Sequence, residues 1–404
     1  LLLSEPLCNA IDRTKKVLPI LLVGAGNIGN EMIKACVWAS QFGGLCKAKI
    51  TVVDKNASWY EQKLRKEAPE FFNGEYELSF YDCDVLTAEF EAVLNEHCSD
   101  SRYIAVTLGD DGLNIKTALY LRSYYLRNDA KFENEPYICV QIDNEIKSQV
   151  TRDFSAVDRE RINRKGWNLD SLNAQNYNLI PFGSKSECYS YQLIVNSEVE
   201  KLALNAHAAY EQLFSDGKES EDEMRSSYNL NEINRNSNRA NAIHLIYKLY
   251  TLGYGIKPFR EASSEEIANS NALVEELSQK LQNAAVIEEL TRIEHDRWNA
   301  YMRSEGFCGS SIDEARIYKN RIGSHKFVRA RLNACICSWN ELDEVCREFD
   351  PKLKEYDKVF IQNAVYILGL SENPKINISK VFSKIIKVIF LQKKYITILM
   401  DIIF

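Results

Sequence analysis

The sequence is poor in histidine and has no spacing of residues that would bind a metal ion. Only five histidines occur among 404 residues, and none belongs to an HExxH pattern. The eleven cysteines are an odd number and include no CxxC pair, which is typical of reduced thiols rather than of a disulfide framework or a zinc site. We therefore expect no metal site, no disulfide framework and a cytoplasmic location.

An excess of positive charge is also absent. The net charge is −7 at pH 7 and the isoelectric point is about 5.5, so nucleic acid is not expected as the main partner. The N-terminal residues lack the basic-then-apolar order of a signal peptide. With 45% hydrophobic and 26% charged residues, the composition is that of an ordinary globular protein. The chain is long enough for more than one domain of about 100–200 residues.

No apolar run is long enough and pure enough to predict a transmembrane helix. The most hydrophobic stretch, residues 380–404, is interrupted by Lys393 and Lys394, and each lysine would cost roughly 2.5–3.5 kcal/mol near a bilayer centre. We expect this tail to dock on the body of the protein. Contact with a membrane surface and a disordered terminus are the alternatives.

The stretch Leu18–Ala35 contains a glycine turn around which the first half of the chain is organised. An apolar run, Leu18–Val23, predicts a buried strand, and a helix is expected to begin at Asn27 or Ile28. The glycines of the intervening turn follow the GxGxxG spacing, at Gly24, Gly26 and Gly29. Such a turn lets a pyrophosphate approach the backbone, where the free N–H groups of the first helical turn, including those of Asn27 and Ile28, can bind it.

Acidic residues follow two later strands. The β-branched run Lys47–Val53 predicts a strand that ends at Asp54, and an acid there can accept hydrogen bonds from both ribose hydroxyls and repel a 2′-phosphate. Alternatively, Asp54 only caps the strand end. A third strand, Tyr76–Tyr81, leads to Asp84 and Val85, which could contact the adenine amino group and ring, or form a plain turn.

Three more strands complete the predicted sheet. Tyr103–Leu108 runs into Gly109 and Asp110, and the runs at 137–142 and 177–181 follow. Asp110 would lie over the ligand crevice, or would simply cap the next helix. The polar stretch 151–176 is long enough for a functional insertion or lid. Six strands with intervening helices predict an α/β fold with a Rossmann-type, doubly wound parallel sheet.

The motifs VGAGNIGNEMIKA, VVD, DCDV and TLGDDGLNIKTALYLR together resemble the TrkA-N (RCK-type) family of Rossmann domains over residues 18–185. This resemblance implies a regulatory sensor of NAD(H), or alternatively of ADP or ATP, that commonly forms a homodimer. It also implies that Gly24, Gly26, Gly29, Asp54, Asp84 and the Gly109–Asp110 turn contact the nucleotide. It supplies no catalytic residue, and His97, the sole histidine of this half, is expected at the surface.

The second half has a different pattern. After a connecting helix and an acidic linker at 186–225, apolar residues recur at helical spacing in four stretches, 238–252, 264–302, 339–349 and 356–370. No further glycine fingerprint or strand-helix alternation appears. We therefore expect an N-terminal extension (1–17), the Rossmann domain (18–185), a mainly α-helical domain (226–370) and the tail (371–404).

The most distinctive motif of this half is the run from Glu294 to Trp298, EHDRW. Helical spacing places Glu294, Arg297 and Trp298 on one face. Such a face can bind an anionic or aromatic ligand, because guanidinium groups bind phosphates and indoles stack on rings. It can equally form a structural corner in which the arginine pairs with the glutamate, and the local pattern alone favours that corner.

The blocks SNRANAIHLIYKL, IEHDRWNAYMRSEGF, RLNACICSWNEL and EYDKVF are similar to the RyR domain, a helical module of ryanodine receptors and bacterial proteins, over residues 226–370. The resemblance implies a second, nucleotide-like ligand or a partner at this module. The residues implicated by it are Asn238, Arg239, His295, Arg297 and Trp298.

Taken together, the motifs predict a non-enzymatic, two-domain sensor. The first domain would bind the nucleotide and the second would respond to it, which requires different ligand affinities in two conformations rather than chemistry. The resemblances imply a role in bacterial anti-phage signalling or ion-transport regulation. The alternatives are an NAD-dependent oxidoreductase and an effector that consumes NAD.

Overall fold

The computed structural model describes residues 6–128, 135–155, 177–185, 198–211, 213, 221–230, 232–258, 264–370 and 376–380. Several predicted segments lie partly outside the described residues. These are 156–176 of the predicted lid, 371–375 and 381–404 of the predicted tail, and 186–197, 212 and 214–220 of the predicted connecting helix and linker.

The first half forms a six-stranded parallel sheet with the order β3-β2-β1-β4-β5-β6. The strands are β1 (Val17–Val23), β2 (Lys47–Asp54), β3 (Glu77–Asp82), β4 (Tyr103–Val106), β5 (Tyr137–Gln141) and β6 (Leu179–Phe182). Every predicted strand is present, and the order is that of a doubly wound Rossmann sheet. The direction of winding reverses between β1 and β4, where such sheets hold their ligands.

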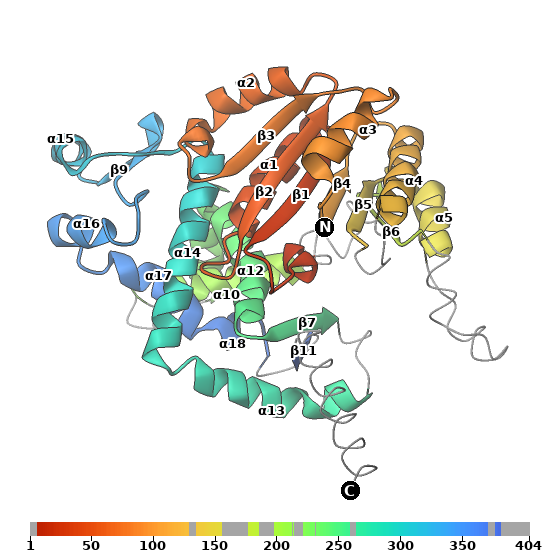
Figure 1. Cartoon of the computed structure of the whole chain (residues 1–404). Coiled ribbons are helices and arrows are strands. Elements are labelled where there is room, and N and C mark those ends of the chain that lie inside the picture. The colour runs from red at the N-terminus through yellow and green to blue at the C-terminus, as the bar shows by residue number, and fades with distance from the viewer. Residues whose placement is uncertain are drawn as a thin grey trace, which may run out of the picture.

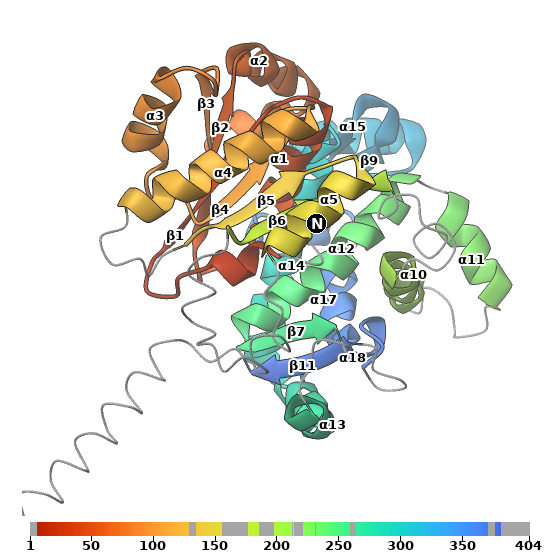
Figure 2. The same cartoon turned by 90° about the vertical axis from the view of Figure 1, so that its right-hand side faces the viewer.

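Helices cover both faces of the sheet because the central strands are apolar on both sides. The helices of this half are α1 (Asn27–Ala39), α2 (Ala57–Glu67), α3 (Glu89–Val93), α4 (Asp111–Asn128) and α5 (Glu145–Ser155). Short helical segments occur at η1 (Leu7–Ala10), η2 (Pro69–Phe72) and η3 (Leu94–Cys98). Along β1, Ile20 and Leu22 pack in the core beneath α1 and α2, whereas Leu21 packs in the core beneath α3 and α4. Figure 2 shows α3 and α4 on their face of the sheet.

The second half is mainly helical, as predicted. Its helices are α10 (Glu198–Glu211), α11 (Glu221–Leu230), α12 (Glu232–Thr251), α13 (Ser264–Lys280), α14 (Ala284–Ser304), α15 (Ile312–Ile322), α16 (Leu342–Glu348), α17 (Leu353–Gln362) and α18 (Ala364–Ile367). The helix α11 begins within the stretch predicted as an acidic linker. In Figure 1, α14 runs beside the sheet, and α13 lies at the end of the molecule farthest from the sheet.

Two helices predicted as continuous are interrupted. The helix expected over 264–302 is two helices, because the Asn283 side chain accepts hydrogen bonds from the N–H groups of Ala285 and Val286 and so begins α14. The helix expected over 356–370 is divided between α17 and α18 at Asn363. Apolar periodicity continues across both interruptions, which is why the sequence pattern did not reveal them.

Short strands also occur where none was expected. The pair β7 (Tyr254–Pro258) and β11 (Ile376–Lys380) is antiparallel. A second small sheet joins β8 (Cys308–Gly309), β9 (Lys326–Phe327) and β10 (Leu332–Asn333), and the 3-10 turn η5 (Val328–Ala330) connects its last two strands. The strands of these sheets are two to five residues long, too short for a clear alternating pattern.

One of the buried hydrophobic clusters contains residues of both halves. Ile246, Tyr247 and Tyr250 of α12 and Ala300 of α14 belong to the same buried cluster as β1, β2 and α1. The N-terminal segment joins this cluster, since Leu7 is buried and its N–H donates to the Tyr247 hydroxyl at 3.2 Å. The helical half is therefore packed directly on the α1 face of the sheet. No helix of the described residues is both long and apolar enough to cross a membrane.

Candidate functional site

The glycine turn between β1 and α1 is closely packed at two of its glycines. Gly24 has φ +100°, and a Cβ there would lie 2.5 Å from the Thr107 carbonyl oxygen. A Cβ on Gly29 would lie 2.0 Å from the Gly24 carbonyl oxygen. Because a side chain fits at neither position, these glycines allow β1, α1 and the end of β4 to meet.

The middle glycine has open space in front of it. No atom lies within 4 Å of the position that a Cβ on Gly26 would take. Gly26 is the N-cap of α1, no side chain caps this helix end, and the first turn contains no acidic residue. The neighbouring Ile28 is 44% exposed. The first helical turn therefore presents backbone N–H groups to solvent at the carboxyl end of the sheet, an arrangement that attracts anions.

Asp54, at the end of β2, is turned toward the glycine loop. Its Oδ2 accepts a hydrogen bond from the Ala25 N–H at 2.9 Å, and its Oδ1 accepts one from the Asn56 N–H at 2.8 Å. The carboxylate thereby holds the glycine turn against the start of α2. This contact is the strand-capping alternative for Asp54, and each oxygen retains a second lone pair for a ligand hydroxyl.

Two carboxylates lie at the end of β3, Asp82 as its last residue and Asp84 in the turn that follows. Asp82 accepts hydrogen bonds from the backbone N–H and the hydroxyl of Ser58, and these bonds lower the pKa of its carboxyl group. Asp84 is exposed and accepts one from the Leu86 N–H at 2.9 Å, while Val85 beside it is half-buried. Both predicted residues of this turn therefore border the carboxyl edge of the sheet.

The next turn, after β4, is capped as the simpler alternative predicted. Gly109 has φ +84°, and the Asp110 carboxylate accepts a hydrogen bond from the Leu113 N–H at 2.7 Å. Its neighbour Asp111 accepts bonds from the N–H groups of Asp143 and Asn144, at 2.8 and 3.0 Å. The Asp111 contacts were not predicted, because they require β4 and β5 to be adjacent in space.

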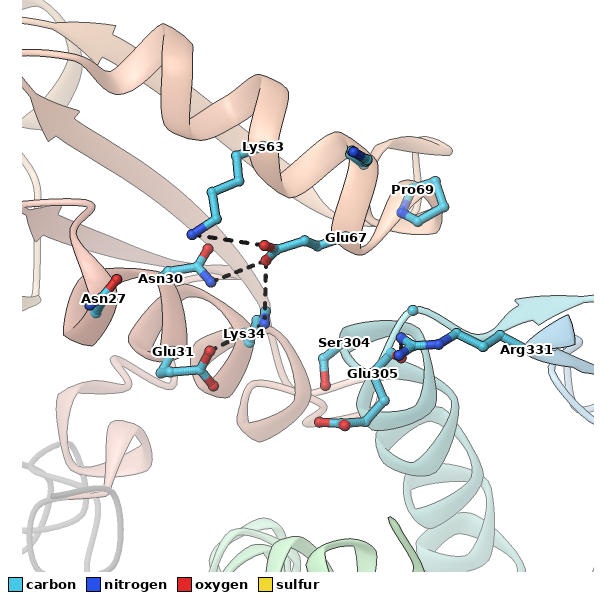
Figure 3. Close-up of a pocket in the computed structure, with 12 residues that line it drawn as sticks. Asn27, Asn30, Glu31, Lys34, Lys63, Glu67, Pro69, Ser304, Glu305 and Arg331 are labelled. Atoms are coloured by element: carbon cyan, nitrogen blue, oxygen red, sulfur yellow. Dashed lines mark hydrogen bonds and ion pairs between the residues drawn. The ribbon is translucent and has the colours of Figure 1, made fainter. Parts of the chain in front are cut away.

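A cleft of about 670 Å³ opens beside α1, next to the glycine turn (Figure 3). Asn27, a predicted nucleotide contact, lines this cleft together with residues of α2 and with residues at the end of α14. The sequence motifs did not predict this cleft, because its walls come from both halves of the chain.

Glu294, His295 and Arg297 of the EHDRW motif lie inside the protein, whereas Asp296 is exposed and Trp298 is half-buried. Glu294, completely buried, pairs with Lys248 Nζ at 2.7 Å and with Arg297 Nη2 at 2.5 Å, and the side-chain amide of Asn241 donates to it at 2.7 Å. Burial raises the pKa of Glu294, but the two cations outweigh burial and lower it to about 2. Burial lowers the pKa of Lys248 to about 8 against the attraction of Glu294. We call these four residues the ion cluster.

His295 joins α14 to two other segments. Its Nδ1 lies 3.0 Å from the Asp357 carboxylate and its Nε2 lies 2.9 Å from the Cys337 carbonyl oxygen. Burial alone would lower the pKa of His295, but the hydrogen bonds to these two acceptors outweigh it and raise the pKa to about 10. Since both ring nitrogens face acceptors, the imidazole carries two protons.

The protonated state of His295 predicts a pH dependence of stability. An unfolded histidine loses its proton near pH 6.5, whereas folded His295 keeps it to about pH 10. Its stabilisation is therefore complete below pH 6.5 and declines as pH rises, by at most about 1.4 kcal/mol per pH unit. We expect the free energy of unfolding of the wild type, measured by urea denaturation between pH 6 and 8, to fall relative to that of His295→Gln.

The comparison with His295→Gln cancels the contribution of Lys248. The lowered pKa of Lys248 acts in the opposite direction above about pH 8, where the unfolded chain retains the proton longer. Parallel pH profiles for the wild type and His295→Gln would show that folding does not raise the pKa of His295.

The five residues implicated as contacts of a second ligand do not line one open site. His295 and Arg297 are buried, and Trp298 packs among the apolar residues around Phe307. Arg239 pairs with Glu200, and Asn238 is buried beside His207. The geometry of this motif corresponds to the structural corner. Among the described residues, no group of three or more His, Cys, Asp or Glu side chains is placed to hold a metal ion.

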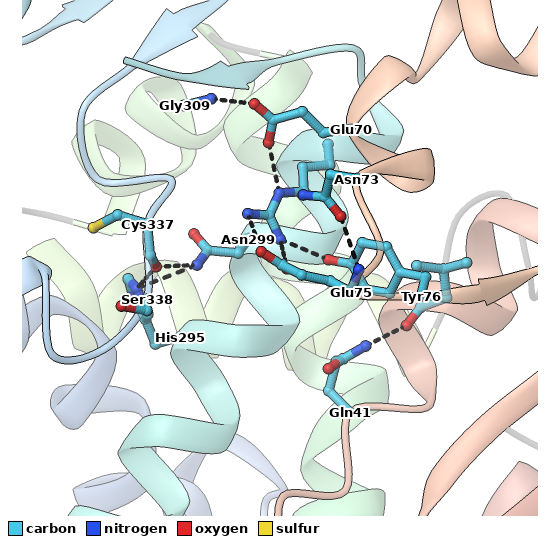
Figure 4. A network of polar contacts seen from close by, with 12 residues as sticks. Gln41, Glu70, Asn73, Glu75, Tyr76, His295, Asn299, Gly309, Cys337 and Ser338 are labelled. Carbon is cyan, nitrogen blue, oxygen red and sulfur yellow. Dashed lines mark hydrogen bonds and ion pairs between the residues drawn. The ribbon is translucent and has the colours of Figure 1, made fainter. Parts of the chain in front are cut away.

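A polar seam joins the end of α14 to the sheet half (Figure 4). The guanidinium of Arg303 donates to the Glu70 carboxylate at 2.7 Å and to the Tyr76 hydroxyl at 2.9 Å, and it also pairs with Glu75. Glu70 accepts a further bond from the Gly309 N–H at 2.7 Å. Arg303 lies within the block IEHDRWNAYMRSEGF, but the sequence did not assign it a role, because its partners lie more than 220 residues away.

The turn at Gly26 is thus the open start of a helix that no side chain caps. Carboxylates border it, and α1 connects it to the helical half.

Comparisons of the chain with protein-family models, curated proteins and solved structures give no match.

Proposed function

We propose that this protein binds an adenine nucleotide, NAD(H) ahead of ADP or ATP, at the glycine turn and acts as a regulatory sensor. The single observation that carries the proposal is the open N-terminus of α1 at Gly26. It lies between β1 and β4, where the direction of winding along the parallel sheet reverses. A pyrophosphate there would accept hydrogen bonds from N–H groups that no side chain caps. This geometry supports binding and does not by itself require a reaction.

Acidic groups support the choice of nucleotide. Asp54 borders the glycine turn at the end of β2, Asp82 ends the adjacent β3, and Asp84 lies in the turn after it. Carboxylates at this edge suit the donor hydroxyls of an unmodified ribose and repel an additional 2′-phosphate. The site therefore favours NAD(H), ADP or ATP over NADP(H).

A sensor must transmit occupancy to another part of the protein, and two contacts support such a role. The helix α1, whose first turn would hold the pyrophosphate, shares a buried core with α12 and α14. Arg303 holds the end of α14 against the loop before β3. Nucleotide binding that changed the position of α1 would therefore alter the packing of the helical half.

The test is calorimetric titration of the full chain with NADH, NAD and ADP, with the absorbance of NADH followed for turnover. Gly26→Asp should weaken NADH binding at least about 100-fold, because it places a negative charge where the pyrophosphate binds. The melting temperature should stay close to that of the wild type, since no atom lies within 4 Å of that position.

Gly44→Asp is the matched control. Gly44 is exposed in the turn before β2 and also has no atom within 4 Å of a Cβ, so this variant adds the same charge away from the site. Absence of saturable nucleotide binding by the wild type would reject the nucleotide site. Turnover of NAD or NADH would reject the sensor and favour the oxidoreductase or the NAD-consuming effector.

A further inference from the structure

The cleft beside α1 is large enough for a small molecule and is built from both halves of the chain. Its volume of about 670 Å³ is within the usual range for ligand sites. One wall is a single face of α1, since Asn27, Asn30, Glu31 and Lys34 are spaced three and four residues apart. The other walls come from α2 and from the end of α14.

Some ammonium groups of the cleft are only weakly paired. Glu67 lies between Lys34 and Lys63, at 3.7 and 3.8 Å, which are longer than direct hydrogen bonds. Lys66 is exposed and forms no ion pair within the described residues. The ammonium groups of Lys63 and Lys66 can therefore turn toward an incoming anion, whereas Lys34 also donates a hydrogen bond to Glu31 at 3.2 Å.

Arg331 lines the cleft and has an unusual backbone conformation. It has φ +54°, in the left-handed region that residues other than glycine seldom adopt. Its guanidinium donates to the Glu305 carbonyl oxygen, and a Cβ on Gly306 would lie 2.6 Å from its Nη1. Such strain persists where the surroundings hold a residue in place, often beside a ligand.

The remaining groups of the lining are acceptors and amides. Glu305 is half-buried, and burial raises the pKa of its carboxyl group, although Lys34 opposes this. Carboxylates and the amides of Asn27 and Asn30 can bind ligand hydroxyls. No aromatic ring lines the cleft, and Pro69 is the single apolar side chain there. A nucleobase would therefore find nothing on which to stack.

We propose that this cleft binds a small phosphorylated sugar or polyol, without a nucleobase, at a site separate from the glycine turn. The phosphate would pair with the ammonium and guanidinium groups of Lys63, Lys66 and Arg331. The hydroxyl groups would bind the amide of Asn30 and the carboxylate of Glu305. Because Glu305 and Arg331 come from the helical half and the other three residues from the sheet half, the ligand would bridge the two halves.

The test titrates the full chain with ribose 5-phosphate, ribose and inorganic phosphate by calorimetry. Ribose 5-phosphate should bind saturably, and ribose and phosphate should each bind at least about tenfold more weakly, since each lacks one set of charge-assisted or hydroxyl contacts. Saturating NADH should not displace it. Equal affinities for ribose 5-phosphate and phosphate would show anion binding without recognition of the sugar, and would reject the proposal.

Two variants locate the site, with one matched control. Lys66→Ala and Arg331→Gly should each weaken ribose 5-phosphate binding roughly tenfold or more and leave NADH binding unchanged. Glycine at 331 removes the guanidinium and suits the left-handed backbone, so the fold is preserved. Lys116→Ala, at an exposed position of α4 on the opposite face of the sheet, should change neither affinity.

The outcomes separate this proposal from nucleotide binding at Gly26. Displacement by NADH, or an affinity for ribose 5-phosphate that survives both cleft substitutions, would overturn the cleft site. If NADH fails to bind but ribose 5-phosphate binds and is lost with Lys66→Ala, the cleft site stands and the nucleotide site fails.

Discussion

Replacement of Glu294 by alanine is expected to lower the free energy of unfolding by about 3–5 kcal/mol, because two cations would remain buried without their counter-charge. Lys248 and Arg297 are each 1% exposed, and Glu294 is their shared partner. Neither side chain can reach water without moving α12 or α14. Urea denaturation at pH 7, monitored by circular dichroism, would measure the loss.

A control on the same helix distinguishes the loss of a buried, paired carboxylate from the loss of an exposed one. Glu289 is exposed on α14, so Glu289→Ala should change the free energy of unfolding by less than about 0.5 kcal/mol. If Glu294→Ala does not fold, Glu294→Gln keeps the shape and should still lose more than about 1 kcal/mol. Equal stability of Glu294→Gln and Glu289→Ala would mean that the ion cluster does not stabilise the fold.

Gly29→Ala is expected to lower the free energy of unfolding by on the order of 3 kcal/mol, although alanine normally favours a helix over glycine. The new methyl group would lie 2.0 Å from the Gly24 carbonyl oxygen and 3.1 Å from the Thr107 hydroxyl. Both neighbours belong to the packed turn and cannot give way without moving α1 from the sheet.

Gly26→Ala, in the same motif, is expected to have little effect on stability. Its φ of −57° suits alanine and its surroundings are open, so the free energy of unfolding should change by less than about 1 kcal/mol. Differential scanning calorimetry of the two variants would compare them directly. Similar melting temperatures would contradict the view that Gly29 serves packing while Gly26 faces open space.

The sheet could be predicted from the sequence because each of its strands is a local apolar run followed by a turn signal. The burial of Leu18–Val23 and the opening of a helix at Asn27 depend on neighbouring residues alone. The spacing of Gly24, Gly26 and Gly29 predicted the close approach of strand and helix, but not that Asp54 would turn inward to the Ala25 N–H. That contact depends on the rotamer of one side chain in the folded loop.

The ion cluster shows where local patterns become insufficient. Helical spacing correctly placed Glu294 near Arg297, but it could not show that Lys248 and Asn241 approach from α12 and close off that face. Those partners are about 50 residues away in the sequence, and they turn a surface that could bind an anion into an interior. The Asn283 cap was present as a local signal, although the apolar periodicity across it concealed the break between α13 and α14.

The core shared by the sheet and the helical half also governs how the protein can be divided. Tyr247 and Ile246 of α12 pack with residues of β1 and α1, so a fragment cut between the halves would expose an apolar face on each piece. Such faces favour aggregation over independent folding. We therefore expect the two halves to stabilise each other, so that a substitution that weakens the ion cluster would also weaken the packing beneath the glycine turn.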